Sequence, residues 1–195
     1  MFDPLPYATY SFVMSITPGP NNVMLTASGA NFGFRRTVPH LLGVFIGYAV
    51  QLIAVCAGLG ALFTKWPILQ AILQWAGAAY LLWLGWKLVR SGEVAQRKVA
   101  EPITFLQAAA FQFVNPKAWV MSLSAVALFL PAGIGIVPAV GYLVLMALPV
   151  NLPCMSAWAL FGSSMRGLLT RRMPRLAFNV SMAVALAATG VIMVA

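Results

Sequence analysis

The chain has 195 residues, of which 62% are hydrophobic and 8% are charged, whereas soluble globular domains average roughly 45–50% apolar and about 25% charged residues. No charged residue occurs from residue 118 to residue 165 and the mean hydropathy is +0.90, so an ordinary soluble domain is excluded and several membrane spans are indicated. The net charge of +9 would suggest a nucleic-acid partner in a soluble protein, but here the basic residues flank apolar segments and no nucleic-acid partner is expected.

Hydrophobic runs separated by polar interruptions predict six spans in one membrane domain. Their expected ranges are 5–31, 38–62, 68–86, 104–130, 138–160 and 176–195. A turn over residues 131–138 divides the long uncharged run into the fourth and fifth spans. Pro149 and Pro153 are expected to disrupt the fifth span, and Asn151 between them either lines a pathway or satisfies a freed carbonyl.

The basic residues predict the orientation, because cytoplasmic loops of membrane proteins are enriched in Lys and Arg. The opposite side holds only Lys65, whereas the loops after spans one, three and five hold ten basic residues: Arg35, Arg36, Lys87, Arg90, Arg97, Lys98, Arg166, Arg171, Arg172 and Arg175. Both termini are therefore expected on the outer side of a bacterial cytoplasmic (inner) membrane. The absence of Lys or Arg before Arg35 also predicts that the first apolar segment is not a cleaved signal peptide.

The two halves of the chain are related when the sequence is shifted by 98 residues, which aligns Thr17-Pro18 with Asn115-Pro116 and Gly43 with Gly141. Each half then holds three spans, so repeats of about 1–98 and 99–195 would lie in the membrane with opposite orientation. The predicted fold is all-α, with six transmembrane helices as two inverted three-helix repeats and helices 1 and 4 interrupted at mid-membrane. Inverted repeats with broken helices are typical of secondary transporters.

The first span is expected to break in the run Thr17-Pro18-Gly19-Pro20-Asn21-Asn22. Its prolines remove two backbone donors and free carbonyls about one turn earlier, while glycine permits unusual backbone angles. Pro20 suits the first position of a new half-helix, which leaves the next amides unpaired. Such an end carries partial positive charge and binds anions. The alternative is a proline kink stabilised by neighbouring helices.

The fourth span is expected to break at Asn115-Pro116-Lys117, because Asn is a preferred N-cap and Pro a preferred first helical residue. Lys117 adds a full positive charge at mid-span, where insertion costs about 2.5–3.5 kcal/mol and such residues generally face a bundle interior or a water-filled path. Snorkelling to the interface is the alternative, but the stem is short against a half-thickness of roughly 15 Å.

If the two breaks meet, both half-helix ends and the Lys117 ammonium form a pocket for a carboxylate, while freed carbonyls and amide side chains accept hydrogen bonds from an ammonium group. That chemistry suits a zwitterionic amino acid. Asp3, Glu93 and Glu101, the three acidic residues, lie outside the spans, so a neutral amino acid is expected rather than lysine or arginine. The candidate substrate-binding residues are Thr17, Pro18, Gly19, Pro20, Asn21, Asn22, Gln112, Asn115, Pro116 and Lys117.

Other residues are assigned supporting roles. Gly43 and Gly47 form a small-residue surface for close helix packing. His40 is interpreted as an interface residue, with proton coupling as the alternative. Cys56 and Cys154 are interpreted as packing residues. No metal site, cofactor or catalytic residue is expected.

The motifs Thr17-Pro18-Gly19-Pro20-Asn21 and Asn115-Pro116-Lys117-Ala118 resemble those of the LysE/RhtB family of bacterial amino-acid exporters, and the run from Gly77 to Lys87 is similar to the family pattern. The resemblance implies efflux of a small-molecule amino acid such as threonine, homoserine or leucine, with proton antiport and alternating access in the lipid bilayer. The sequence leaves a homo-oligomer open. Alternatives are an anion-selective channel or an exporter of another small zwitterion. An intramembrane enzyme is disfavoured because no Asp, Glu, His or Cys cluster occurs at mid-span.

Overall fold

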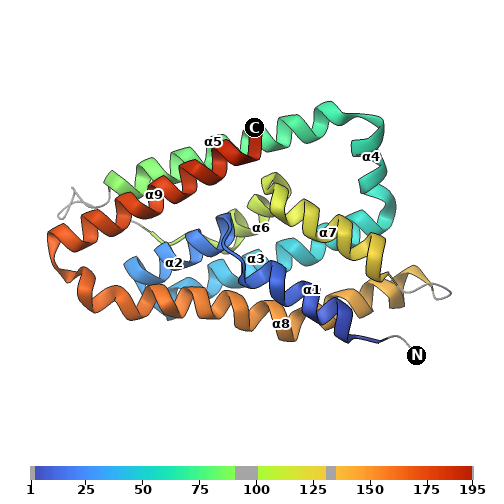
Figure 1. The fold of residues 1–195 in the computed structure, drawn as a ribbon, viewed down its shortest axis with the longest axis horizontal. Coiled ribbons are helices and arrows are strands. Elements are labelled where there is room, and N and C mark those ends of the chain that lie inside the picture. Colours follow the sequence, from blue (N-terminus) through green and yellow to red (C-terminus); the bar gives the residue numbers. More distant parts are fainter. Residues whose placement is uncertain (1–2, 91–100, 131–134, 195) are drawn as a thin grey trace.

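The computed structural model describes residues 3–90, 101–130 and 135–194, which are helical throughout apart from short connections and contain no strand. The predicted loop residues 91–100, with Glu93, Arg97 and Lys98, and the turn residues 131–134 lie outside the described residues. The elements, shown in Figure 1, are α1 (Leu5–Ile16), α2 (Pro20–Phe32), α3 (Phe34–Ala54), η1 (Val55–Leu59), α4 (Gly60–Lys65), α5 (Pro67–Arg90), α6 (Phe105–Val114), α7 (Pro116–Phe129), α8 (Ile136–Ser164), η2 (Met165–Thr170) and α9 (Arg172–Val194).

Two apolar segments are interrupted at the residues that the sequence predicted. The first divides into α1 and α2 around Thr17, and the second into α6 and α7 at Asn115. Both residues precede a proline and adopt extended backbone angles, with ψ of 136° at Thr17 and 107° at Asn115. A proline disfavours the helical conformation in the residue before it, and this local effect ends α1 and α6.

Several helices begin or end beyond the predicted boundaries. A single residue, Gly33, connects α2 to α3, because its φ of 82° permits a sharp turn that other residues rarely adopt. Arg35 and Arg36 therefore lie in the first turn of α3 rather than in a loop. Lys87 and Arg90 likewise lie in the last turn of α5, above the rings of Trp83 and Trp86.

The expected disruption of the fifth span is wrong. The helix α8 runs without a break from Ile136 to Ser164, with Pro149 and Pro153 inside it. It packs against α1, α2 and α3, and neighbouring helices are known to stabilise prolines within transmembrane helices. Asn151, between the two prolines, accepts a hydrogen bond of 2.8 Å from the Ser15 hydroxyl.

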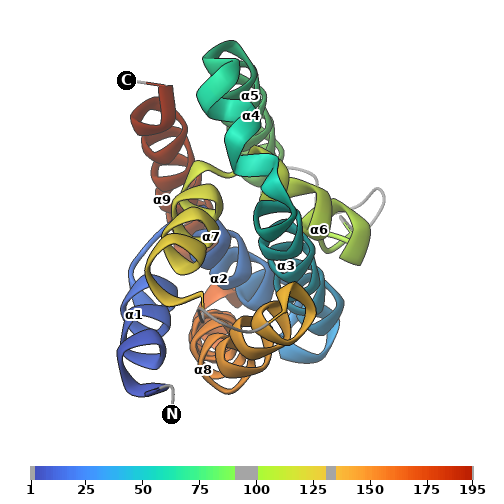
Figure 2. The same cartoon turned by 90° about the vertical axis from the view of Figure 1, so that its right-hand side faces the viewer.

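The helices pack against one another in pairs. The helices α5 and α9 lie side by side on one face of the molecule, α8 forms the opposite face, and the interrupted segments lie between them (Figures 1 and 2). The pair α2 and α8 and the pair α3 and α6 also pack closely. A Cβ added at Gly162 would lie 2.0 Å from the Thr26 carbonyl oxygen, and one added at Gly43 would lie 2.3 Å from the Phe105 carbonyl oxygen. Glycine is needed at both crossings, because backbone lies where a side chain would be.

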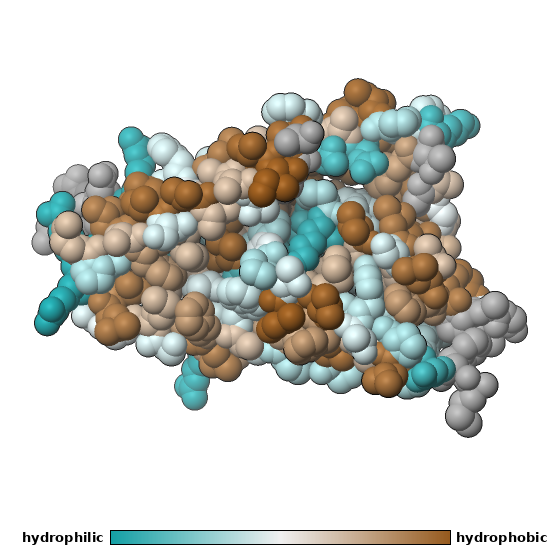
Figure 3. All heavy atoms as spheres, viewed as in Figure 1, coloured by the Kyte–Doolittle hydropathy of each residue, from teal (hydrophilic) through white to brown (hydrophobic). Residues whose placement is uncertain are grey.

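The outer surface is strongly apolar. Large hydrophobic side chains are exposed on several helices, including Trp75 at 64% and Leu106 at 75%. Figure 3 shows hydrophobic residues over much of one face, with many hydrophilic ones toward the two ends and a further hydrophilic group near the centre. Four helical stretches are long and apolar enough to cross a membrane: Phe34–Leu59, Pro67–Arg90, Ile136–Thr170 and Arg172–Ile192. The fold is that of an all-helical integral membrane protein.

His40 lies inside the protein rather than on its surface. Its side chain is fully buried in α3, and neither ring nitrogen has a hydrogen-bond partner among the described residues. His40 lies in the second turn of α3, which begins at Phe34.

Candidate functional site

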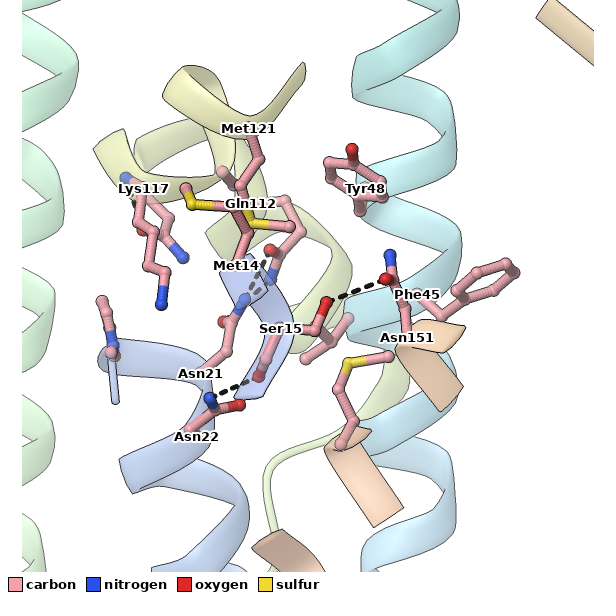
Figure 4. Close-up of a pocket in the computed structure, with 16 residues that line it drawn as sticks. Met14, Ser15, Asn21, Asn22, Phe45, Tyr48, Gln112, Lys117, Met121 and Asn151 are labelled. Carbon is pink, nitrogen blue, oxygen red and sulfur yellow. Dashed lines mark hydrogen bonds between the residues drawn. The ribbon is translucent and has the colours of Figure 1, made fainter. Parts of the chain in front are cut away.

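A cavity of about 40 Å³ lies between the two helix breaks (Figure 4). It is bordered by α1, α2, α3, α6, α7 and α8. Seven of the predicted binding residues line it: Gly19, Pro20, Asn21, Asn22, Gln112, Asn115 and Lys117. Thr17, Pro18 and Pro116 do not. Pro116 instead borders a smaller pocket with Phe63 and Trp119.

The ammonium of Lys117 connects the two interrupted segments. Its Nζ atom donates hydrogen bonds to the carbonyl oxygens of Thr17 at 2.8 Å and Pro18 at 3.3 Å. From the sequence, these carbonyls were expected to bind an ammonium group of the substrate. In the structure, they bind the ammonium group of Lys117 instead. Gly19 makes room for this contact, because a Cβ there would lie 2.8 Å from Cδ of Lys117.

The carbonyls freed by the first break are also bound from within their own half. The Asn22 amide donates to the carbonyl oxygens of Ser15 at 2.8 Å and Thr17 at 2.9 Å. The Thr17 carbonyl therefore receives two donors, one from Asn22 and one from Lys117. The side chains of Thr17 and Pro18 are exposed, and the Thr17 hydroxyl donates to the carbonyl oxygen of Val13. These two residues thus contribute their backbone to the site rather than their side chains.

A reciprocal amide pair joins the two halves on another wall of the cavity. Asn21 Nδ2 donates to Gln112 Oε1 at 2.8 Å, and Gln112 Nε2 donates to Asn21 Oδ1 at 3.1 Å. Gln51 of α3 donates to the Gln112 carbonyl oxygen at 3.1 Å. Both glutamines are fully buried. This network fixes α2, α6 and α3 relative to one another, and sequence reasoning missed the contribution of Gln51.

The two half-helix N-termini differ. At the start of α7, the Asn115 side chain accepts a hydrogen bond of 3.1 Å from the Lys117 backbone amide, so this end is capped. At the start of α2, Gly19 offers no side-chain cap. Because Gly19, Pro20 and Asn21 all line the cavity, the uncapped positive end of α2 borders it. This end is the better position for an anion.

The remaining lining residues were missed or left open by sequence reasoning: Met14, Ser15, Val44, Phe45, Tyr48, Ala118, Met121, Asn151 and Met155. Ser15 could have been found from the sequence, because it lies one turn after Ser11 on the same buried face of α1. Nothing in the sequence indicates the apolar lining residues, because their contacts come from distant segments. Among the described lining residues there is no carboxylate, and Lys117 is the one charged side chain.

The chain is similar in sequence to known proteins. The family described as LysE type translocator matches residues 12–195. The chain belongs to the LysE family. The cysteine/O-acetylserine efflux proteins of Escherichia coli strain K12 and Shigella sonnei are 36% identical to it over 142 residues, which cover 72% of each chain. The protein of the same name from Escherichia coli O1:K1 is 35% identical over the same coverage. No solved structure matches the chain.

Membership of the LysE family confirms the resemblance seen in the two proline motifs. A LysE-type translocator is a membrane transport protein rather than an enzyme. The family match extends across both helix breaks and the cavity between them. The cavity is therefore the natural candidate for the site at which a transported molecule binds.

Proposed function

We propose that this LysE-family protein exports small neutral amino acids from the cytoplasm, and that they bind in the cavity between the two helix breaks. The observation that carries the proposal is the Lys117 ammonium bound to the Thr17 and Pro18 carbonyls. These groups supply both partners that a zwitterion needs. The ammonium can bind a carboxylate, and the carbonyls can bind an amino group.

When the substrate binds, the hydrogen bonds between Lys117 and the two carbonyls are replaced by hydrogen bonds to the substrate. The amino group of the substrate takes the carbonyls of Thr17 and Pro18, and Lys117 turns to the substrate carboxylate beside the uncapped end of α2. A simple anion would draw Lys117 away without offering the Pro18 carbonyl a donor in its place, while the Thr17 carbonyl would keep the Asn22 amide. An additional positive charge on the substrate would find no carboxylate among the described residues of the cavity. The exchange therefore favours neutral amino acids over both classes.

Alternating access is part of this proposal. The cavity has room for roughly three water molecules and lies between two helix breaks, one from each half of the chain. We propose that the two halves of the single membrane domain rock around it as inverted repeats.

The packing of the helices supports the inverted repeat. Exchange of the two halves of the chain converts the pair α1 and α8 into the pair α6 and α3, and the pair α2 and α8 into the pair α7 and α3. All four pairs are in contact. The same exchange replaces α5 by α9 and α9 by α5, and these two helices also pack together. In this proposal the six spans lie in the cytoplasmic (inner) membrane, with both termini outside and the basic residues of the predicted loops inside.

The lining of the cavity and the relatives together suggest the substrate. The relatives are named for cysteine and O-acetylserine efflux. In this chain, Met14, Met121 and Met155 provide a polarisable apolar wall, which suits a small side chain. We therefore place cysteine and O-acetylserine ahead of threonine, homoserine and leucine, with proton antiport as the driving reaction.

Efflux from loaded cells tests the proposal. Cells with and without the protein are loaded with labelled cysteine, O-acetylserine, threonine, leucine and lysine, and release is followed with the proton gradient intact or collapsed. Saturable, gradient-dependent release of a small neutral amino acid, with no release of lysine, is expected. Release that does not saturate and favours simple anions would instead identify an anion-selective channel. If another small zwitterion alone is released, the amino-acid assignment is wrong.

A further inference from the structure

We propose that a second cavity, at the end of the molecule where α2 and α5 end and α3 and α9 begin, binds the phosphate headgroup of an anionic phospholipid. This cavity measures about 300 Å³. It is bounded by α2, α3, α5, η2, α9 and the segment that leads into α6. It shares no lining residue with the cavity around Lys117. The proposal is thus separate from the export site.

The charges around this cavity are strongly unbalanced. Four cationic side chains from four different elements line it: Arg36, Lys87, Arg166 and Arg175. Glu101 is the single carboxylate among the described lining residues. Like charges gathered around one space repel each other, and the repulsion is relieved when an anion binds among them. The charge distribution therefore favours binding of an anionic ligand.

Contacts within the protein hold several of these cations at the cavity. Arg36 lies over the ring of Phe32 at 5.7 Å, and Lys87 lies over the ring of Trp83 at 5.2 Å. The Nε atom of Arg175 is buried and has no hydrogen-bond partner among the described residues. A buried guanidinium nitrogen without a partner is costly. A phosphate oxygen would satisfy it, since guanidinium groups bind phosphate with well-directed hydrogen bonds.

The rest of the wall is apolar, which distinguishes a lipid from a free anion. Met24, Tyr80, Trp83, Leu84 and Leu186 line the cavity beyond its cationic side chains. Trp83 is 45% exposed, so the wall continues onto the outer surface of α5. A free phosphate has no apolar group that could contact this wall, whereas a phospholipid places its headgroup among the cations and an acyl chain along the apolar surface. Basic pockets between transmembrane helices are known to bind lipid headgroups in this way.

Lipid binding to the purified full chain tests the proposal with two matched double variants. Arg36→Gln with Arg175→Gln removes two cations from the cavity. Arg35→Gln with Arg172→Gln removes two exposed cations at the same end that do not line it. The delipidated proteins are titrated with phosphatidylglycerol or phosphatidylcholine in detergent, and bound lipid is counted by native mass spectrometry.

We expect the wild type and the Arg35/Arg172 variant to prefer phosphatidylglycerol, and the Arg36/Arg175 variant to bind it roughly 30-fold more weakly. Equal weakening in both variants, or equal binding of the two lipids, would overturn the proposal. Inorganic phosphate that matches phosphatidylglycerol in affinity would identify a free-phosphate site and also overturn it. Because bound lipid is measured rather than transport, failure here leaves the export proposal untouched, and failure of export leaves this result untouched.

Discussion

The Nζ atom of Lys117 lies 2.8 Å from the carbonyl oxygen of Thr17, a residue 100 positions earlier in the chain. This contact joins the two helix breaks, because Lys117 is in the first turn of α7 and Thr17 follows the last residue of α1. Asn22 donates to the same carbonyl from the other side. The break in the first segment is therefore stabilised by both halves of the protein, and in the proposed mechanism the substrate replaces the contact from the second half.

Replacement of Lys117 by Met should abolish export while the protein still inserts into the membrane. A hydrogen bond to a charged group contributes about 1.5–3 kcal/mol, so loss of the bond between Lys117 and the substrate carboxylate corresponds to at least a roughly 10-fold loss of substrate binding. Asn22 still binds the Thr17 carbonyl in this variant, so the fold should persist. Efflux of labelled substrate and membrane content are the measurements.

Lys65→Met provides the matched control for Lys117→Met. Lys65 is exposed, contacts the ring of Trp66 at 4.9 Å and does not line the cavity. Its replacement removes the same charge and should leave efflux unchanged. Normal export by Lys117→Met, or equal loss in both variants, would contradict the assigned role of Lys117.

Gly19→Ala should reduce export by displacing Lys117. The added Cβ would lie 2.8 Å from Cδ and 3.1 Å from Nζ of Lys117, so the flexible side chain must leave the carbonyls. The backbone at Gly19 is extended, with φ of −176°, and accepts alanine without strain. We expect lower efflux with unchanged thermal stability. Gly167→Ala, where no atom lies within 4 Å of the added Cβ, should export normally, and an unaffected Gly19→Ala variant would count against this contact.

Gly43→Ala should destabilise the protein. Its Cβ would lie 2.3 Å from the Phe105 carbonyl oxygen, and backbone of α6 cannot move aside as a side chain can. Such overpacking typically costs about 1–3 kcal/mol. Thermal unfolding in detergent measures the loss. Gly141→Ala is the control, because no atom lies within 4 Å of its added Cβ, and equal stability of the two variants would show that α3 and α6 are not in close contact.

His40→Met should keep or raise thermal stability. The imidazole is fully buried and neither nitrogen has a partner among the described residues, and replacement of an unpaired polar group by an apolar one of similar size removes a desolvation cost of about 1–3 kcal/mol. Thermal unfolding and proton-dependent efflux are measured on the same variant. A marked loss of stability would reveal a partner for His40, and loss of gradient dependence alone would identify His40 as a proton carrier.

The helix breaks could be predicted from the sequence because proline acts locally. Pro18 and Pro116 force the preceding residue into an extended conformation, and Asn115 caps α7 through its own side chain. The apolar segments follow equally from composition. The same local reasoning failed at Pro149 and Pro153, where contacts of α8 with other helices preserve the helix.

Tertiary structure alone decided how these local features are used. The sequence repeat pairs Gly43 with Gly141, yet Gly43 contacts α6 while Gly141 has open space beside it. Lys117 binds a carbonyl 100 residues earlier in the chain. The burial of His40 likewise depends on residues far apart in the chain, and so does the position of Arg36 and Arg175 around one cavity. A sequence determines where its backbone must break and which charges it carries, because these are local properties. Which groups then meet depends on how whole helices pack, and that is a property of all of them together.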